Sequence, residues 1–395
     1  MPEAREPLRR VCVVTTSRAD YGLLRRLMRE IAADQALELQ VVATAMHLLP
    51  DFGHTVNEIT GDGFQIARCV DMLLGGDSAV AAAKSIGVGM VSFADALREL
   101  SPHILVLLGD RFELLGIAAA ALMLRIPIAH IHGGETSEGA LDEQVRHALT
   151  KMATFHFPAA QAYKDRIIQM GEDPARVFTF GAPGLDDLYQ SASLTREELE
   201  ARLEFDLSEP VALVTYHPVT LQPGTAVSHV AQLLRAVERA GLRAVFTKAN
   251  ADEEGRAVNH ALTEFCAHDS SRYRLFESLG TELYRSLMAC CTLMLGNSSS
   301  GLIEAPWFRL PVVNIGERQR GRVRAANVVD CGNGSEAIET AIRKACSEEF
   351  RSGLHSLENP YDVTRDGSAS RRIKDVLKTL ELSPAVLQKH FHDIP

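Results

Sequence analysis

The chain has 395 residues, of which 46% are hydrophobic and 23% charged, the composition of an ordinary soluble globular protein. That length predicts two domains, because a single hydrophobic core rarely grows beyond about 250–300 residues. The formal net charge of -10 argues against a surface that binds nucleic acid or anionic membrane through its overall field.

Cysteine usage and apolar runs predict the compartment. Seven cysteines without metal-ligand spacing predict reduced thiols and no metal site. No cleavable leader is recognised after Arg9 and Arg10, and the most apolar stretch, residues 114–131, is interrupted by Arg125 and Pro127. We therefore expect a cytoplasmic protein that does not enter a membrane.

The first half of the chain alternates apolar strands with helices, which predicts a parallel sheet. Strands are expected at residues 11–15, 37–44, 64–70, 105–108, 127–131, 154–158 and 177–180, and helices at residues 23–33 and 78–100. The first strand runs into a polar loop before its helix, an arrangement that suits phosphate binding. Arg18 in that loop is a candidate phosphate ligand; the alternative is a surface arginine paired with Asp20.

Charged residues follow the fourth and fifth strands. Asp110 and Arg111 come after the fourth, His132 and Glu135 after the fifth, and a helix begins near Asp142. Because carboxyl ends of parallel strands share one edge, these side chains are expected to converge on an acid/base site beside an anion clamp. The alternative is structural: a strand-end ion pair, a solvated loop glutamate and a helix-start aspartate. Neighbouring glycines, which let a ligand approach the backbone, favour function.

A helical linker over residues 185–203 leads to a second series of strands and helices. Its strands are expected at residues 211–215, 243–247, 273–276, 292–295 and 311–315, and helices at residues 369–380 and 384–392 end the chain. His217 follows the first of these strands, and Asn250 follows the second.

The fourth strand of this half is followed by Ser298, Ser299 and Ser300, opening a helix that contains Glu304. Three hydroxyls at a helix start predict a phosphate cradle, whereas a plain helix cap needs only one. After the fifth strand, residues 318–324 carry four arginines. They are either a solvated basic loop or a partner for an anionic ligand near the serines.

Taken together, these motifs resemble the hydrolysing UDP-N-acetylglucosamine 2-epimerases of sialic-acid and legionaminic-acid biosynthesis. The resembling segments are residues 16–21, 109–111, 132–135, 142–147, 217–218, 297–301 and 316–319, in the family's order. The resemblance implies two Rossmann-like α/β domains facing across a cleft, of the glycosyltransferase-B type. We expect residues 1–184 to carry the acids and residues 185–368 to hold UDP, with C-terminal helices in residues 369–395 packing back on the first domain.

The resemblance also implies roles for particular residues. It gives catalytic roles to Asp110, Glu135, Asp142 and His217. It places around UDP and the sugar the residues Arg18, Arg111, Asn250, Ser298, Ser299, Glu304 and Arg318. It further implies a homodimer or a higher oligomer such as a tetramer, and no cofactor is expected.

The implied reaction converts UDP-GlcNAc to ManNAc and UDP through elimination to a glycal and addition of water. A carboxylate serves as the base at C2, a second steadies positive charge on the ring, and arginines and serines hold the departing diphosphate. Which carboxylate is the base stays open. The alternative substrate is UDP-N,N'-diacetylbacillosamine, giving 2,4-diacetamido-2,4,6-trideoxymannose. Further alternatives are a non-hydrolysing epimerase, a glycosyltransferase and a non-catalytic UDP-sugar sensor.

Overall fold

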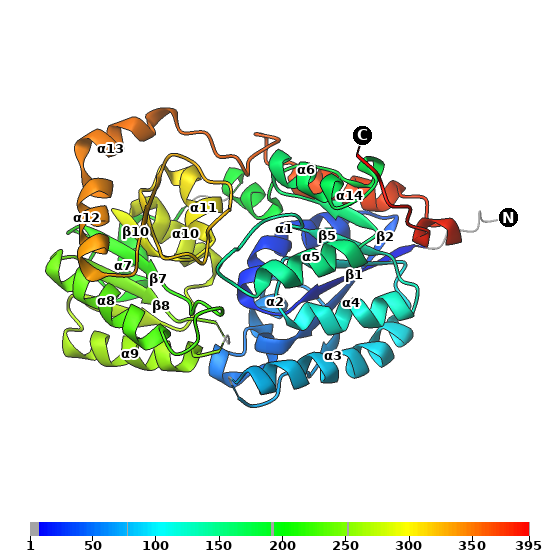
Figure 1. The fold of residues 1–395 in the computed structure, drawn as a ribbon, viewed down its shortest axis with the longest axis horizontal. Coiled ribbons are helices and arrows are strands. Elements are labelled where there is room, and N and C mark those ends of the chain that lie inside the picture. The colour runs from blue at the N-terminus through cyan, green and yellow to red at the C-terminus, as the bar shows by residue number, and fades with distance from the viewer. Residues whose placement is uncertain (1–7, 77, 191–192, 251–252, 395) are drawn as a thin grey trace.

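The computed structural model describes residues 8–76, 78–190, 193–250 and 253–394. Within these residues each half of the chain forms one six-stranded parallel sheet, so the molecule has two lobes (Figure 1). The first sheet has the order β3-β2-β1-β4-β5-β6. Its strands are β1 (Arg9–Thr15), β2 (Leu37–Thr44), β3 (Ile66–Val70), β4 (Ile104–Leu108), β5 (Ile128–Ile131) and β6 (Phe155–Phe157).

The second sheet has the order β12-β11-β10-β7-β8-β9. Its strands are β7 (Val211–Thr215), β8 (Arg243–Thr247), β9 (Tyr273–Phe276), β10 (Leu293–Gly296), β11 (Val312–Ile315) and β12 (Val328–Cys331). In each sheet the chain order reverses beside the first strand, between β1 and β4 and between β7 and β10. A crevice opens at such a reversal, at the carboxyl ends of the strands.

Helices cover both faces of the first sheet. One face packs against α1 (Arg18–Ala33), α2 (Val56–Gly61) and α14 (Ala369–Thr379). The other packs against α3 (Ala79–Leu100), α4 (Glu113–Met123) and α5 (Asp142–Met152). The central strands between them are buried on both sides, and every residue of β4 is buried, whereas the edge strand β3 is mostly exposed. Such strands are nearly continuous apolar runs, which is why the sequence predicts them well.

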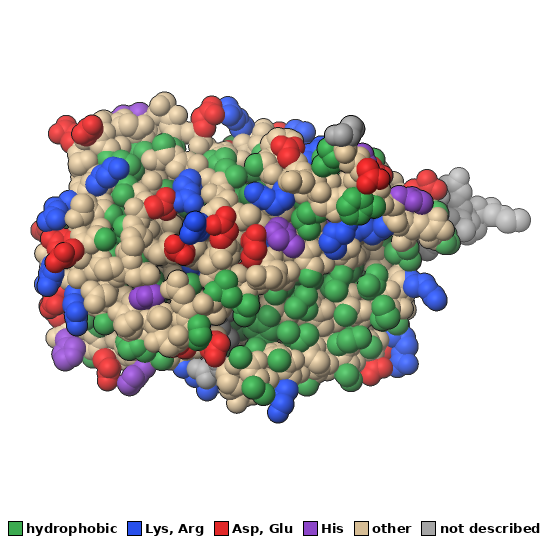
Figure 2. All heavy atoms as spheres, viewed as in Figure 1, with side chains coloured by type: hydrophobic (Ala, Val, Ile, Leu, Met, Phe, Trp, Pro, Cys, Tyr) green, Lys and Arg blue, Asp and Glu red, His purple; other side chains and the backbone are tan. Residues whose placement is uncertain are grey.

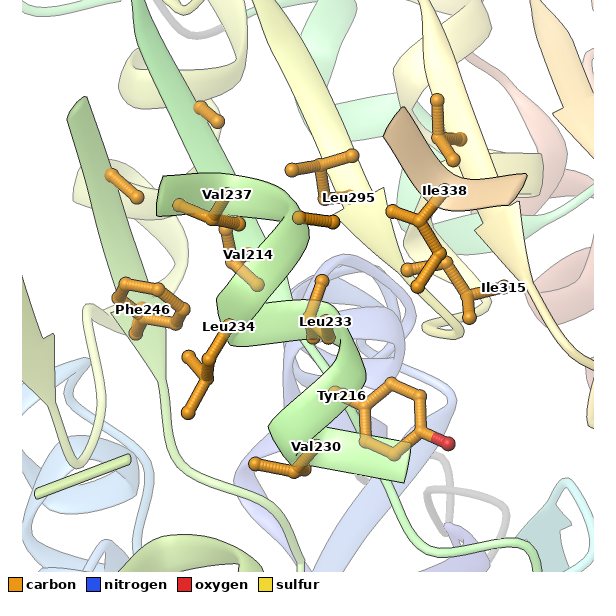
Figure 3. Packing of buried hydrophobic residues seen from close by; sticks show 14 of the residues in the cluster. Val214, Tyr216, Val230, Leu233, Leu234, Val237, Phe246, Leu295, Ile315 and Ile338 are labelled. Atoms are coloured by element: carbon orange, nitrogen blue, oxygen red, sulfur yellow. The ribbon is translucent and has the colours of Figure 1, made fainter. Parts of the chain in front are cut away.

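The second sheet is covered in the same way. Its larger core lies under α8 (Ala226–Arg239), α9 (Gly255–His268) and α12 (Ser335–Cys346). Figure 3 shows this core, where Val230, Leu233 and Val237 of α8 point at Val214 and Leu295 of the sheet. The opposite face packs against α7 (Arg196–Leu203) and α10 (Gly280–Cys290). The remaining helices are α6 (Gln161–Gln169), α11 (Ser300–Ile303) and α13 (Glu348–Ser352).

Several local predictions were wrong. Residues 177–180 form no strand, and Val177 makes only an isolated bridge to His156. β12 was missed, because this edge strand has only two β-branched residues before a polar Asp330. The linker over residues 185–203 is no continuous helix: a 3-10 helix, Pro183–Tyr189, precedes α7, which begins after the Thr195 cap.

Two helix ends also differ from prediction. α1 begins at Arg18 and not at residue 23, because the Asp20 carboxylate accepts the backbone N–H groups of Thr16 and Ser17, both at 2.7 Å. That bond pattern caps the helix one turn earlier. Of residues 384–392, only Pro384–Leu387 is helical, as a short 3-10 turn.

The C-terminal helix α14 lies on the first lobe (Figure 1). Ile373 and Leu377 are buried in the core shared with α1. Lys374 and Lys378 hold Asp34 at the end of α1 at 3.1 and 3.0 Å. We retain residues 1–184, 185–368 and 369–395 as the proposed division of the chain.

α3 presents much of its length to the surface. Among the described residues it is the one helix long and apolar enough to cross a membrane by length and composition, and 28% of its most apolar window is buried. Phe93 and Leu97 face the core, whereas Val91 is 71% exposed. Figure 2 shows hydrophobic side chains gathered over α3 and α4. Met123 at the end of α4 is also exposed.

We predict that Ile373→Ala destabilises the first lobe, because it leaves a cavity between α14 and α1. The free energy of unfolding should fall by about 2–4 kcal/mol. Denaturant unfolding followed by circular dichroism measures this change. The exposed neighbour Arg371 provides the control, since Arg371→Ala should stay within about 0.5 kcal/mol. Equal losses in both variants would show that α14 does not pack on the core.

Candidate active site

A cavity lies between the carboxyl ends of the two sheets and is lined from both lobes. The first lobe contributes the loops after β1 and β4 and the start of α5; the second contributes the loops after β7, β8, β10 and β11. Every predicted site residue lines this cavity except Glu135, which is buried behind it. The structure therefore brings together residues as far apart in the chain as Arg18 and Arg318.

Arg18 enters the cavity from the first turn of α1. Its predicted alternative, a pair with Asp20, does not form, because Asp20 is engaged by the backbone and hydroxyl groups of Thr16 and Ser17. Burial lowers the pKa of Arg18, and the nearby Glu58 opposes that shift. Among the described residues, no hydrogen-bond acceptor meets its buried Nη1 atom. A guanidinium placed in this way suits an anionic ligand.

Asp110 and Asp142 face the cavity from the first lobe. The carboxylate of Asp110 contacts the guanidinium of Arg146 and lies 3.5 Å from Arg322. Asp142 begins α5 and lies 3.7 Å from Arg318 of the second lobe. Both acids thus lie beside arginines of the cavity wall.

Arg146 is a buried residue that contacts the acids from inside the first lobe. Its side chain is fully buried and donates to Glu135 O at 3.0 Å and to Ser137 Oγ at 2.9 Å. Burial and the charge of Arg322 lower the pKa of Arg146 below the usual guanidinium range. The buried guanidinium is paired with two carboxylates, since Asp110 contacts it and Glu143 lies 3.3 Å from it.

Glu135 is 1% exposed and is separated from the cavity. It accepts from His132 Nδ1 at 2.5 Å and lies 3.2 Å from Arg322. Burial alone would raise the pKa of Glu135, but Arg322 and His132 outweigh it and lower the pKa. The glycines of this motif serve packing and not the approach of a ligand. A Cβ on Gly134 would lie 2.5 Å from Tyr163 O of α6, and a Cβ on Gly133 would lie 2.9 Å from His130 Nδ1.

His217 is held at the opposite wall by a pair of bonds to Asn297. Asn297 Oδ1 accepts the His217 N–H at 2.7 Å, and its Nδ2 donates to His217 O at 2.8 Å. The Asn250 N–H donates to His217 Nδ1 at 3.3 Å. Nδ1 is therefore an acceptor, and a neutral His217 carries its proton on Nε2.

The serine cluster lines the cavity but opens only the short helix α11. Ser298 Oγ and Ser300 Oγ lie 2.7 Å apart, and Ser300 Oγ lies 2.9 Å from Tyr284 Oη. Glu304 follows α11 and is not inside a helix; it accepts from Arg285 Nε at 3.1 Å. These are hydroxyl groups at a cavity wall, and the prediction that the helix behind them contains Glu304 was wrong, because α11 ends at Ile303.

Sequence reasoning missed Tyr284 and Arg285 of α10 and gave Arg322 no role of its own. α10 carries no motif at a strand end, so no local signal marks its two lining residues. Arg322 has a signal in the run of four arginines, but the run does not tell its members apart. Arg318 and Arg322 line the cavity, whereas Arg320 pairs with surface acids.

The two facing α/β sheets have the glycosyltransferase-B arrangement, and solved structures share it. The UDP-GlcNAc 2-epimerase of Neisseria meningitidis, bound to UDP-GlcNAc, superposes with a TM-score of 0.78 at 17% identity, covering 93% of this chain and 99% of that one. At that identity the likeness shows the fold, which confirms the predicted class.

Residues 29–378 match the family model described as UDP-N-acetylglucosamine 2-epimerase. A GDP/UDP-N,N'-diacetylbacillosamine 2-epimerase (hydrolyzing) of Campylobacter jejuni is 38% identical over 98% of this chain and 99% of its own. A UDP-N,N'-diacetylbacillosamine 2-epimerase (hydrolyzing) of Legionella pneumophila is 36% identical over 97% and 99%. The chain therefore belongs to the UDP-N-acetylglucosamine 2-epimerase family, in its hydrolysing branch, and it is an enzyme.

We predict that Ser298→Ala with Ser299→Ala weakens UDP binding and leaves the fold intact. A hydrogen bond to a charged oxygen contributes about 1.5–3 kcal/mol, so the double change should raise the UDP dissociation constant well over tenfold. Isothermal titration calorimetry measures it. Ser228→Ala, on the exposed side of α8, is the matched control. An unchanged affinity of the double variant for UDP would show that these serines serve only as a helix cap.

Proposed function

We propose that this enzyme hydrolyses and epimerises UDP-N,N'-diacetylbacillosamine, giving UDP and 2,4-diacetamido-2,4,6-trideoxymannose. The observation that carries this proposal is the near full-length identity of 38% and 36% to two enzymes named for that sugar. The sequence motifs favoured UDP-GlcNAc and gave UDP-N,N'-diacetylbacillosamine as the alternative, so this proposal reverses that order. UDP-GlcNAc, converted to ManNAc, is the second candidate, and the family model's description supports it.

The arrangement of charges supports the elimination route. Acids line the first-lobe wall of the cavity, and serines with Arg318 and His217 line the second. A UDP-sugar bound across it would place the diphosphate near the second wall and C2 near the acids. The C2 proton passes to a carboxylate, the C1–O bond breaks with its electron pair leaving on UDP, and C1=C2 forms. Water then adds across this bond, returning a proton to C2 and a hydroxyl to C1.

We assign the C2 base to Asp110 or Asp142, because of the three acids predicted to be catalytic these two line the cavity. Glu135 belongs to the same group but acts through its neighbours, since it is buried behind the wall. Arg18, Arg111, Asn250 and Glu304 complete the lining around the nucleotide and sugar. His217, with Nε2 as a donor, is suited to the departing phosphate oxygen.

Turnover of both sugars in heavy water tests the proposal. We expect UDP release to be faster from UDP-N,N'-diacetylbacillosamine, with deuterium at C2 of the free sugar, because the original proton leaves and a solvent deuteron returns. Chromatography measures UDP, and NMR locates the deuterium. A product still joined to UDP would indicate a non-hydrolysing epimerase, and transfer to an acceptor would indicate a glycosyltransferase.

The acid variants are the controls for this experiment. Asp110→Asn and Asp142→Asn keep shape and remove charge, so the base variant should lose turnover while UDP still binds. Full activity in both variants would show that the reaction takes place at another site. If the wild type bound both sugars and released no UDP, the protein would be a non-catalytic UDP-sugar sensor.

We also propose that the enzyme is a cytoplasmic homo-oligomer, a dimer or tetramer, in which a second copy covers the apolar surface of α3 and α4. Val91→Glu should reduce the molar mass measured by light scattering, because it places a charge in that contact. Val227→Glu, on exposed α8 and away from this surface, is the matched control. An unchanged mass in Val91→Glu would exclude this surface as the contact.

A further inference from the structure

The loop after β11 crosses from the second lobe to the first, and two glycines permit its close approach. Gly321 has φ +83°, and a Cβ there would lie 2.7 Å from Thr136 Oγ1. A Cβ on Gly139 would lie 2.7 Å from Glu317 O. The Glu138 N–H donates to Arg320 O at 3.2 Å, so backbone meets backbone across the two lobes.

The residue after Arg322 is fixed as well. The Val323 N–H donates to Tyr163 Oη at 2.9 Å, and Tyr361 Oη donates to Val323 O at 2.9 Å. The two tyrosine hydroxyls lie 2.7 Å apart in a buried contact. Arg322 therefore sits between anchored neighbours, which limits the directions its side chain can take.

The guanidinium of Arg322 uses all three nitrogens on the first lobe. Nη1 lies 3.2 Å from Glu135 Oε2, Nη2 lies 3.5 Å from Asp110 Oδ2, and Nε donates to Thr136 O at 3.1 Å. The side chain is 9% exposed and forms part of the cavity wall. It thus stands between the buried Glu135 and the open site.

The two acids depend on Arg322 to different degrees. Asp110 also contacts Arg146, so it keeps a cation if Arg322 is removed. Glu135 is buried, and Arg322 and His132 are the two groups that lower its pKa most, so without Arg322 it would retain only His132 of the two. A buried carboxylate without adequate pairing takes up a proton more readily.

We propose that Arg322 is a positioning residue for the reaction proposed above: it fixes the carboxylates of Asp110 and Glu135, so that a loop of the second lobe completes the acid group of the first. The inference rests on the proposed function. It implies that the carboxylates of Asp110 and Glu135 keep their positions only while the loop after β11 is packed against the first lobe. A role in holding the diphosphate would instead show as lost UDP affinity.

Arg322→Met tests this role, and Arg320→Met is the matched control from the same loop. Arg320 also reaches the first lobe, lying 3.0 Å from Glu138, but it is 62% exposed and outside the cavity wall. We expect Arg322→Met to lower kcat about 100-fold while the UDP dissociation constant changes less than about threefold. Arg320→Met should stay within about twofold on both measures.

The pH profile separates positioning from a merely structural role. Without Arg322, Glu135 takes up its proton at a higher pH, so the acidic limb of kcat should move upward. Arg322→Lys, which keeps the charge, should recover part of kcat and move the limb back. If Arg322→Met does not fold, Arg322→Lys still tests the proposal.

Thermal unfolding without substrate gives a second measure. In the wild type the folded-state pKa of Glu135 is lowered, so its contribution to stability is full above the unfolded pKa and is lost as the pH falls through the folded pKa. The deficit in Tm of Arg322→Met should therefore be largest near neutral pH and shrink as the pH falls toward about 4. Arg320→Met should show no such dependence.

Two results would overturn the proposal. One is a kcat and pH profile for Arg322→Met that match the wild type. The other is a loss of UDP affinity that accounts for the whole loss in kcat/KM, which would make Arg322 a ligand-binding residue. If the wild type releases UDP from neither sugar, the proposed function fails, whereas the unfolding comparison still decides whether Arg322 holds Glu135.

Discussion

Parallel strands of one sheet all end at the same edge, and the site of this enzyme depends on that constraint. Each sheet reverses its chain order next to its first strand, so the loops after β1 and β4 diverge, as do those after β7 and β10. The two openings face each other across the cavity. Residues as distant as Asp110 and Arg318 can line one cavity because their strands, and not their sequence neighbours, fix where they lie.

Charge is arranged locally in a chain that is acidic overall. Carboxylates gather on the first lobe, and each meets an arginine: Asp110 with Arg146 and Arg322, Asp142 with Arg318. Buried charges of one sign are costly, so a site that needs several acids also needs cations nearby. Some of those cations come from the other lobe, which ties the ionisation of the acids to the packing of the two lobes.

The same fold accommodates family members that act on different sugars, so the fold cannot select the substrate. The sheets and their buried cores are explained by packing alone. The choice between two sugars that differ at C4 and C6 depends on a few side chains of the cavity wall. The solved structure at 17% identity therefore supports only the fold. The substrate proposal rests on the relatives that match over nearly their full length.

The sequence alone determined the β/α rhythm and placed most of the predicted site residues at strand ends that meet at the cavity. Strands buried on both faces, such as β4, are unbroken apolar runs, and the residues that follow them are at the site edge by necessity. Some helix ends were predicted wrongly and the edge strand β12 was missed, because caps and edges depend on a few polar contacts. Only the tertiary structure showed that Glu135 lies behind the wall and that Arg322 stands before it. Arg322 and Asp110 are separated by 212 positions, and no local pattern records which of four neighbouring arginines will meet a buried acid across two lobes.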